Sequence, residues 1–228
     1  MRSTAARRAK SSDGSRRSHW TRGCARQPNG WANMAKPAND IREAINVLKR
    51  GGVVVFPTET AYGLAADATN TKAVAKIYQI KGREAGKSLP LIASDQKMAE
   101  RYVRLSPAMK KLAKIHWPGP LTIVSPPNKG KSGGGLARRV VRDGTIAIRV
   151  ADHAIARALA KGLGEPITAT SANLSGQPTC YSARAVHKQG VVADFVIDIG
   201  ALPRRKPSTI VAEKEGEIVV LRKGPIRL

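Results

Sequence analysis

Apolar positions in the first periodic stretch of the chain change from helical to strand-like spacing. Across 41–48 apolar residues recur every three or four positions, and Asp40 with Glu43 three residues later has the pattern of a capping box. The next apolar run, 53–56, is β-branched and has no polar alternation, which is typical of a strand covered on both faces. We therefore expect the ordered part of the chain to begin at Asn39 or Asp40.

The same two kinds of spacing continue to the end of the chain. Helices are predicted over 71–80, 96–103, 107–115, 153–163 and 182–189. Strands are predicted over 89–93, 121–124, 145–149, 167–169, 195–199, 209–211 and 218–221. Because strands and helices intermix throughout, the sequence predicts an α/β or α+β fold with a mixed sheet.

Length and composition favour one folded domain that attracts phosphates. The chain has 228 residues, 42% of them apolar, which is enough for one substantial core. With 40 Lys and Arg against 16 Asp and Glu, the formal net charge is +24, and such a surface attracts nucleotides or RNA. The two cysteines, Cys24 and Cys180, form no metal cluster, and no apolar run reaches the roughly 18 to 20 residues of a membrane span. We expect a soluble protein in a reducing compartment, the cytoplasm.

The first 33 residues differ in composition from the rest. They hold eight Arg or Lys and one Asp among Ser, Gly and Ala, with little apolar periodicity. The stretch is interpreted as an RNA-binding arm, as an organellar presequence, or as the product of a translation start assigned before the true first residue, Met34. We expect a disordered basic extension over 1–35 and one folded domain over 36–228.

Two polar segments sit at the ends of predicted elements. Thr58 and Thr60 directly follow the first strand, where they either cap a turn or face a ligand. Lys81 and Arg83 end the second helix, a position that the helix dipole favours for cations in any protein. Two cations separated by one glycine can also grip a single phosphate chain.

Later segments repeat this arrangement of polar groups after strands. Arg149 alternates with apolar residues on a predicted strand, so it faces a cavity or is exposed at a sheet edge. Ser171 and Asn173 follow the next strand; they form an ordinary turn or donate hydrogen bonds to an anion. The four histidines, at positions 19, 116, 153 and 187, have no metal-ligand spacing, so no protein-held metal is expected.

Seven segments occur in an order that resembles the YrdC-like family of threonylcarbamoyl-AMP synthases, from about Asp40 to Ile226. They are GGVVVFPTETAYGLAADA, IYQIKGR, WPGPLT, GTIAIRV, TATSANLSG, PSTIV and LRKGPI. The resemblance implies a twisted mixed sheet with helices around a concave basic cavity. It also implies the synthesis of L-threonylcarbamoyl adenylate and pyrophosphate from L-threonine, bicarbonate and ATP, the first step towards threonylcarbamoyladenosine in tRNA.

The resemblance assigns roles to particular residues. Thr58 and Thr60 would lie at the threonine pocket, with Arg149 holding the substrate carboxylate and Ser171 assisting. The residues implied at the nucleotide are Lys81, Arg83, Thr145, Asn173, Ser208 and Arg222. Mg²⁺ would be held mostly by ATP oxygens and water, because no carboxylate cluster is visible in the sequence.

The chain departs from the family pattern after Arg83. Glu84 stands where the family usually has proline, which leaves open whether Lys87 or Ser88 contacts the nucleotide. The chain resembles the short form of the family, without an additional C-terminal domain. An affinity for tRNA and a contact with the downstream threonylcarbamoyl transferase complex are left open.

The rival hypothesis is a non-enzymatic protein that binds double-stranded or ribosomal RNA, since a +24 charge suits both functions. A pure binder has no use for hydroxyl and amide groups placed beside two cations, whereas a synthase needs them. A carbamoyl-transfer module of the hydrogenase maturation type shares the implied fold, but the zinc-finger and acylphosphatase-like regions of those proteins do not occur in this sequence.

Overall fold

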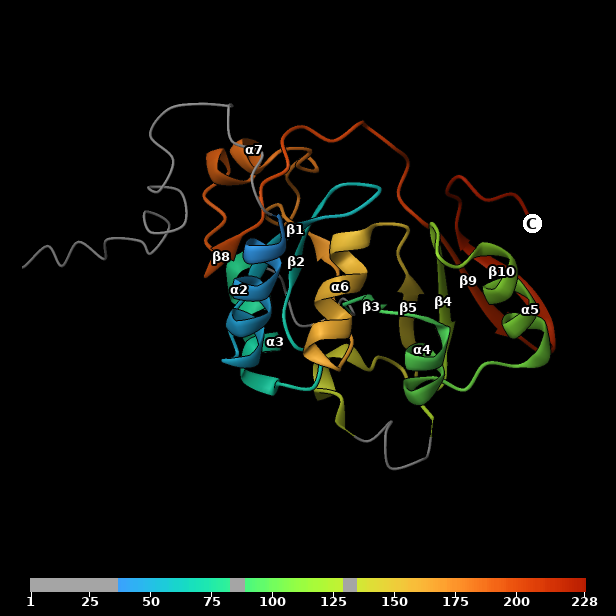
Figure 1. Cartoon of the computed structure of the whole chain (residues 1–228). Helices are drawn as coiled ribbons and strands as arrows, with labels where there is room; N and C mark the ends of the chain where they lie inside the picture. The colour runs from blue at the N-terminus through green and yellow to red at the C-terminus, as the bar shows by residue number, and fades with distance from the viewer. Residues whose placement is uncertain (1–36, 83–88, 129–134) are drawn as a thin grey trace, which may run out of the picture.

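A computed structural model of the chain describes residues 37–82, 89–128 and 135–228. Within these ranges the chain forms two mixed β-sheets and six α-helices (Figure 1). The α/β class predicted from the apolar spacing is confirmed, and the strands divide between two sheets.

The smaller sheet is built around the first hairpin. Its strands are β1 (Val54–Pro57), β2 (Tyr62–Ala65), β7 (Thr170–Ser171) and β8 (Phe195–Val196), in the order β7-β2-β1-β8. β1 and β2 pair antiparallel, with Pro57 opposite Tyr62 at the closed end of the hairpin, and β1 pairs parallel with β8. Both hairpin strands are completely buried, as the uninterrupted apolar run predicted for β1.

The larger sheet has six strands in the order β10-β9-β4-β5-β3-β6. They are β3 (Leu91–Ala93), β4 (Leu121–Ser125), β5 (Ile146–Val150), β6 (Ile167–Thr168), β9 (Thr209–Lys214) and β10 (Glu217–Arg222). β5 lies in its middle, antiparallel to β4 and parallel to β3. The position of β5 places its C-terminal residues inside the molecule, where they can approach the first hairpin.

Helices pack on the two sheets and against one another. They are α2 (Pro37–Lys49), α3 (Thr71–Lys81), α4 (Gln96–Tyr102), α5 (Pro107–His116), α6 (Ala154–Leu163) and α7 (Ala183–Lys188). A short 3-10 helix, η2 (Arg138–Val140), contacts α3. α6 packs on β3 of the large sheet, on β1 of the small sheet and on α2, so this one helix bridges the two sheets (Figure 1).

The ends of α3 are set by two capping residues. The side chain of Asn70 accepts hydrogen bonds from the backbone amides of Lys72 and Ala73, and Gly82 takes the left-handed conformation (φ 55°) that ends the helix. Lys81 is therefore fixed as the last residue of the helix. It is buried.

The structure differs from the sequence predictions at the start of the first helix and after β6. The helix predicted to begin with a capping box at Asp40 begins at Pro37, and proline suits a first helical position because its missing N–H is not needed there. Asp40 thus lies in the first turn instead of at the cap. The strand predicted over 167–169 is β6, which ends one residue earlier, and the sequence did not predict β7, which belongs to the other sheet. The predicted basic extension over 1–35 lies outside the described residues.

Candidate functional site

Thr58 organises the turn that closes the first hairpin. Its hydroxyl donates to the carbonyl of Ala61 (2.7 Å) and accepts from the backbone amides of Thr60 and Ala61 (3.2 Å each). Since a hydroxyl has one proton, the 3.0 Å contact between the Thr58 and Thr60 hydroxyls makes Thr60 the donor. Thr58 is buried and holds the turn, whereas the half-buried Thr60 keeps lone pairs for another group.

An ion pair joins this turn to the large sheet. The guanidinium Nη1 of Arg149, in β5, donates to Oε1 of Glu59, which lies between the two threonines. The side chains are only 8% and 7% exposed. The alternative in which Arg149 is exposed at a sheet edge is therefore wrong. The sequence predictions for the site do not include Glu59, although it lies in the motif Pro-Thr-Glu-Thr between two predicted site residues.

A second arginine approaches Arg149. Arg222, the last residue of β10, donates from Nε and Nη2 to the carbonyl of Ser208 (3.0 and 2.9 Å) and from Nη2 to the Ser208 hydroxyl (3.0 Å). The partial burial of its guanidinium lowers the pKa of Arg222, although the residue as a whole is exposed, and the positive charge of Arg149 lowers the pKa further. Two neighbouring guanidinium groups that repel each other favour an anion between them.

Ser208 connects Arg222 to the core of the large sheet. Ser208 is buried, and its hydroxyl lies 2.8 Å from that of Thr122 in β4. Arg149 makes no further hydrogen bond to the described residues, so two of its guanidinium nitrogens remain for a ligand. Of the predicted residues, the structure therefore brings Arg149, Arg222 and Ser208 together at one site.

Lys81, Ser171 and Asn173 form a second group. The Lys81 ammonium donates to the carbonyls of Ser171 (2.6 Å) and Asn173 (2.7 Å) and to the Asn173 side-chain oxygen (3.3 Å). The Ser171 hydroxyl donates to that same oxygen, and the Asn173 amide donates to the carbonyl of Leu174 (3.0 Å). Lys81 is thus bound to the loop, and its predicted approach to a phosphate stays a prediction.

The loop that carries Ser171 lies beside the start of β2. Ser171 pairs with Gly63, and the backbone amide of Ala172 donates to the carbonyl of Tyr62 (2.9 Å). Tyr62 is two residues after Thr60. The second group is therefore attached to the strand that leaves the Thr58 turn.

Thr145 lies apart from both groups. Its hydroxyl donates to the carbonyl of Arg142 (2.9 Å) in the turn before β5. At roughly 3.3 Å per residue, this turn is about 13 Å along the strand from Arg149. The predicted nucleotide contact of Thr145 stays a prediction, and the predicted phosphate ligand Arg83 lies outside the described residues together with Lys87 and Ser88.

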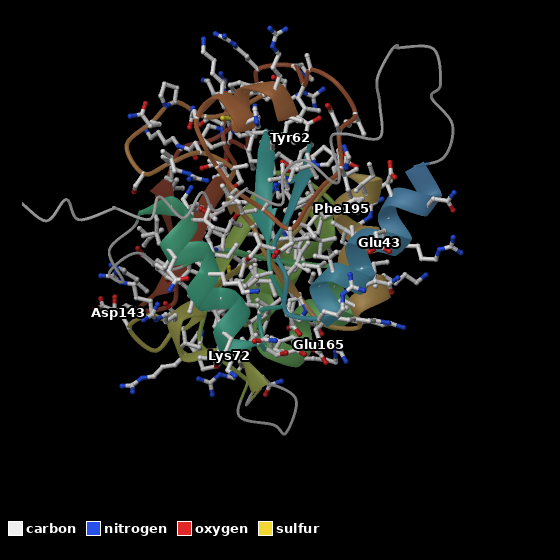
Figure 2. All side chains as sticks on the ribbon, turned by 90° about the vertical axis from the view of Figure 1, so that its left-hand side faces the viewer. Glu43, Tyr62, Lys72, Asp143, Glu165 and Phe195 are labelled. Atoms are coloured by element: carbon white, nitrogen blue, oxygen red, sulfur yellow. The ribbon has the colours of Figure 1, made fainter. Side chains whose placement is uncertain are left out.

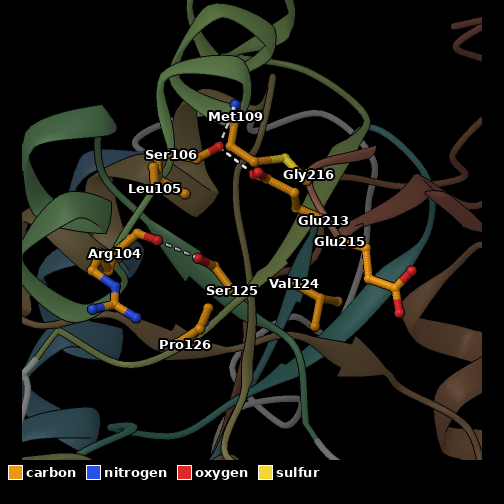
Figure 3. A pocket seen from close by; sticks show the side chains of 10 residues that line it. All are labelled: Arg104, Leu105, Ser106, Met109, Val124, Ser125, Pro126, Glu213, Glu215 and Gly216. Atoms are coloured by element: carbon orange, nitrogen blue, oxygen red, sulfur yellow. Dashed lines mark hydrogen bonds between the residues drawn. The ribbon is translucent and has the colours of Figure 1, made fainter. Parts of the chain in front are cut away.

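A cavity of about 460 Å³ opens elsewhere on the large sheet (Figure 3). It lies between the start of α5 and the β9–β10 turn, and the lining side chains include Ser106, Glu213 and Glu215. Ser106 donates to the Glu213 carboxylate across the cavity. Glu213 is roughly 16 Å along β9 from Ser208 at about 3.3 Å per residue, and two carboxylates repel phosphates. This cavity is therefore separate from the arginine site.

The described residues offer neither a metal-binding cluster nor a membrane-spanning helix. Over 37–82, 89–128 and 135–228, no three His, Cys, Asp or Glu side chains gather in a way that could hold a metal ion. In the same ranges no helix combines the length and apolar character needed to cross a bilayer. The side chains of the described site residues are thus cations, hydroxyls, an amide and one carboxylate.

A mixed α/β fold that holds two arginines beside hydroxyl-rich loops is typical of proteins that bind a small anionic substrate. A family model described as telomere recombination, which covers Sua5, YciO and YrdC, matches residues 46–224. The chain belongs to this Sua5/YciO/YrdC family, and the resemblance seen in the seven segments is confirmed.

Individual relatives agree with this assignment. The chain is 35% identical over 173 residues to the threonylcarbamoyl-AMP synthase of Thiobacillus denitrificans, covering 75% of this chain and 90% of the relative. The crystal structure of P. abyssi Sua5 complexed with L-threonine has a TM-score of 0.74 at 36% identity, covering 81% of this chain and 54% of that one. The structure of E. coli YciO has a TM-score of 0.70 at 28% identity, and the match covers 81% of this chain and 89% of YciO. This chain therefore spans about half of the P. abyssi protein and most of the other two.

Proposed function

We propose that the chain is a threonylcarbamoyl-AMP synthase, which makes L-threonylcarbamoyl adenylate and pyrophosphate from L-threonine, bicarbonate and ATP. The observation that carries the proposal is the buried Arg149 beside Arg222, next to the Thr58–Thr60 turn. The relative from Thiobacillus denitrificans is named for this activity, and a related structure contains L-threonine.

In the proposed complex, Arg149 binds the threonine carboxylate with the two nitrogens that Glu59 does not use. Such a fork gives two parallel hydrogen bonds and fixes the orientation of the amino acid. Thr60 offers its hydroxyl oxygen as an acceptor beside this carboxylate. We expect Thr58 to act indirectly, because its own hydroxyl is occupied within the turn.

The proposed reaction has two bond-forming steps. The threonine amine attacks the carbon of bicarbonate, and the amine proton and the hydroxide of bicarbonate leave together as water to give the carbamate. A carbamate oxygen then attacks the α-phosphorus of ATP, from which pyrophosphate leaves. Neither step needs a covalent enzyme intermediate, so the protein mainly positions its substrates and offsets their negative charge. Arg222 and Ser208 are proposed to act at the nucleotide, with Ser171 and Asn173 completing the site.

Mg²⁺ is proposed to enter with ATP. The described residues offer no cluster of metal-ligating side chains, and Mg²⁺ is commonly held by substrate phosphates and water. It would offset charge on the phosphates as part of the substrate. The predicted affinity for tRNA, the contact with a transferase complex and the cytoplasmic location remain predictions, and the relatives do not favour the RNA-binding alternative.

Pyrophosphate release by the purified full chain tests the proposal. With ATP, bicarbonate and L-threonine present, we expect release that stops when threonine is omitted, together with the adenylate product by mass spectrometry. Thr60→Val should lower kcat/KM for threonine by about 10-fold, because it removes one polar contact while keeping the side-chain shape. Thr71→Val, at the exposed start of α3, is the matched control and should act like the unchanged protein. Pyrophosphate release that does not depend on threonine would refute the proposal.

A further inference from the structure

Two polar atoms next to the Arg149 site are buried and lack a hydrogen-bond partner. They are Oε2 of Glu59 and Nδ1 of His153. Glu59 already binds Arg149 through its other oxygen, and His153 follows Arg149 by four residues at the start of α6. A buried carboxylate oxygen without a donor is costly, so its place behind a binding arginine calls for a functional explanation.

The Glu59 carboxylate is the charged group that acts most strongly on His153. Burial lowers the pKa of His153, and the carboxylate of Glu59 opposes this more strongly than any other charged group. Smaller effects come from Arg157, Asp152 and Arg149. Asp152 adjoins His153 in the chain but is 72% exposed, which explains its weaker effect. Glu59 thus has an unused acceptor, Oε2, and His153 can carry a proton on its unused nitrogen, Nδ1.

We propose that His153 is a positioning residue of the threonine site, which donates from Nδ1 to Oε2 of Glu59 when the amino acid is bound. The carboxylate is then held at both oxygens, by His153 on one side and Arg149 on the other. This chain of contacts keeps the two remaining nitrogens of Arg149 directed at the threonine carboxylate. The inference rests on the proposed synthase function and adds a supporting residue to its substrate site.

We expect the contact to form with substrate. No hydrogen bond joins Glu59 to His153 in the structure. A carboxylate bound by Arg149 would draw the guanidinium towards the ligand, and Glu59 would move with its ion-pair partner. Hydrogen bonds in unliganded sites are commonly long and shorten only in the substrate complex. A support of this kind fixes orientation without touching the reacting atoms.

A pair of isosteric substitutions separates the hydrogen bond from the shape of the side chain. The amide nitrogen of asparagine occupies the place of histidine Nδ1, so His153→Asn keeps a donor there. His153→Leu fills similar space without one. His116→Leu, at the end of α5, is the control for replacing a histidine elsewhere. KM for threonine, KM for ATP and the thermal unfolding midpoint are measured for all four full-length proteins.

We expect His153→Leu to raise KM for threonine about 10-fold with KM for ATP changed less than roughly 2-fold, since one charge-assisted hydrogen bond is lost at the amino-acid end of the site only. His153→Asn should stay within about 3-fold of the unchanged protein. Equal effects on both KM values, or an asparagine variant as impaired as the leucine variant, would show a purely structural role and overturn the inference. An unchanged protein without threonine-dependent turnover would instead refute the proposed function.

Glu59→Gln supplies a second test through non-additivity. If His153 acts through Glu59, adding His153→Leu to Glu59→Gln should not raise KM for threonine further, because the acceptor is already altered. Additive effects of the two substitutions would contradict the proposal. Calorimetric titration of L-threonine without ATP gives the same comparison as a dissociation constant, so a variant too slow for kinetics is still informative.

Discussion

At the scale of single residues, Lys81 shows how a cation predicted to bind ligand can also hold a loop together. Its ammonium lies within 2.7 Å of two backbone carbonyls, those of Ser171 and Asn173. Both carbonyls belong to the loop that carries Ser171, predicted at the threonine, and Asn173, predicted at the nucleotide. Loss of the ammonium would leave these oxygens without that donor and release the loop.

Lys81→Met should therefore lower the free energy of unfolding by about 2 kcal/mol, because buried acceptors without donors are costly. It should also lower turnover. Urea denaturation and pyrophosphate release measure the two effects. Lys72→Met is the control on the same helix: Lys72 is exposed at the edge of the molecule (Figure 2), and its replacement should change stability by less than about 0.5 kcal/mol. A Lys81→Met protein as stable as the control would contradict the structural role.

The sequence predicted some of the site residues and missed others. The sequence indicated Arg149, Ser208 and Arg222 through a family resemblance, and the structure brings these three together. The sequence alone did not indicate Glu59, because its partner comes 90 residues later and the pairing exists only in the fold. A carboxylate is also not expected in a site for anions, because it repels them, unless it pairs with an arginine.

At the scale of elements, Tyr62 ties the start of β2 to the segment that follows β8. Its hydroxyl accepts from the backbone amide of Ile199 (3.1 Å) and donates to the carbonyl of Gly200 (2.8 Å). The ring is completely buried. Burial is the main reason why the pKa of Tyr62 is raised above its ordinary value.

Tyr62→Phe should lower the free energy of unfolding by about 2 kcal/mol at neutral pH, since two backbone groups lose their partner. The raised pKa has a further consequence with a defined sign. The folded chain holds the Tyr62 proton more tightly than the unfolded chain does. The contribution of the protonated hydroxyl to the free energy of unfolding is therefore complete below about pH 10 and is lost as pH rises above it.

Urea denaturation at about pH 8 and about pH 11 checks both statements, because these values lie on either side of the ordinary tyrosine pKa. The unchanged protein should lose more stability between the two pH values than Tyr62→Phe does. Tyr181→Phe is the control with the same chemistry on a half-buried ring. An identical pH dependence in all three proteins would contradict the expectation.

Element types were easier to predict than element partners. Helices with strong periodicity were predicted to within two residues at each end, as for α4 and α5. The sequence did not predict β2, Tyr62–Ala65, because its four residues include a glycine and no β-branched side chain, unlike the run at 53–56. It becomes a strand by pairing with β1 and β7, and such long-range pairing is not encoded in local spacing.

At the scale of the whole molecule, the +24 charge bears on how substrates arrive. A strongly positive protein attracts ATP over a distance and does little for threonine, which has no net charge at neutral pH. Salt shortens the range of this attraction to about 10 Å at 0.1 M and about 3 Å at 1 M. The two substrates should therefore respond differently to ionic strength.

KM for ATP should rise several-fold between roughly 0.05 M and 0.5 M potassium chloride, while KM for threonine changes by less than about 2-fold, because screening acts on the charged substrate. Steady-state kinetics at constant Mg²⁺ measure both values. The threonine measurement serves as the internal control. Equal salt dependence for the two substrates would show that net charge has no part in nucleotide capture.

The contact between Glu59 and Arg149 makes the two sheets depend on each other for activity. Glu59 follows β1 of the small sheet, and Arg149 belongs to β5 of the large one. In the proposed complex, both sheets therefore contribute residues to the amino-acid pocket. A substitution far from the substrate can tilt one sheet against the other. Such a change would then weaken threonine binding before it unfolds the molecule.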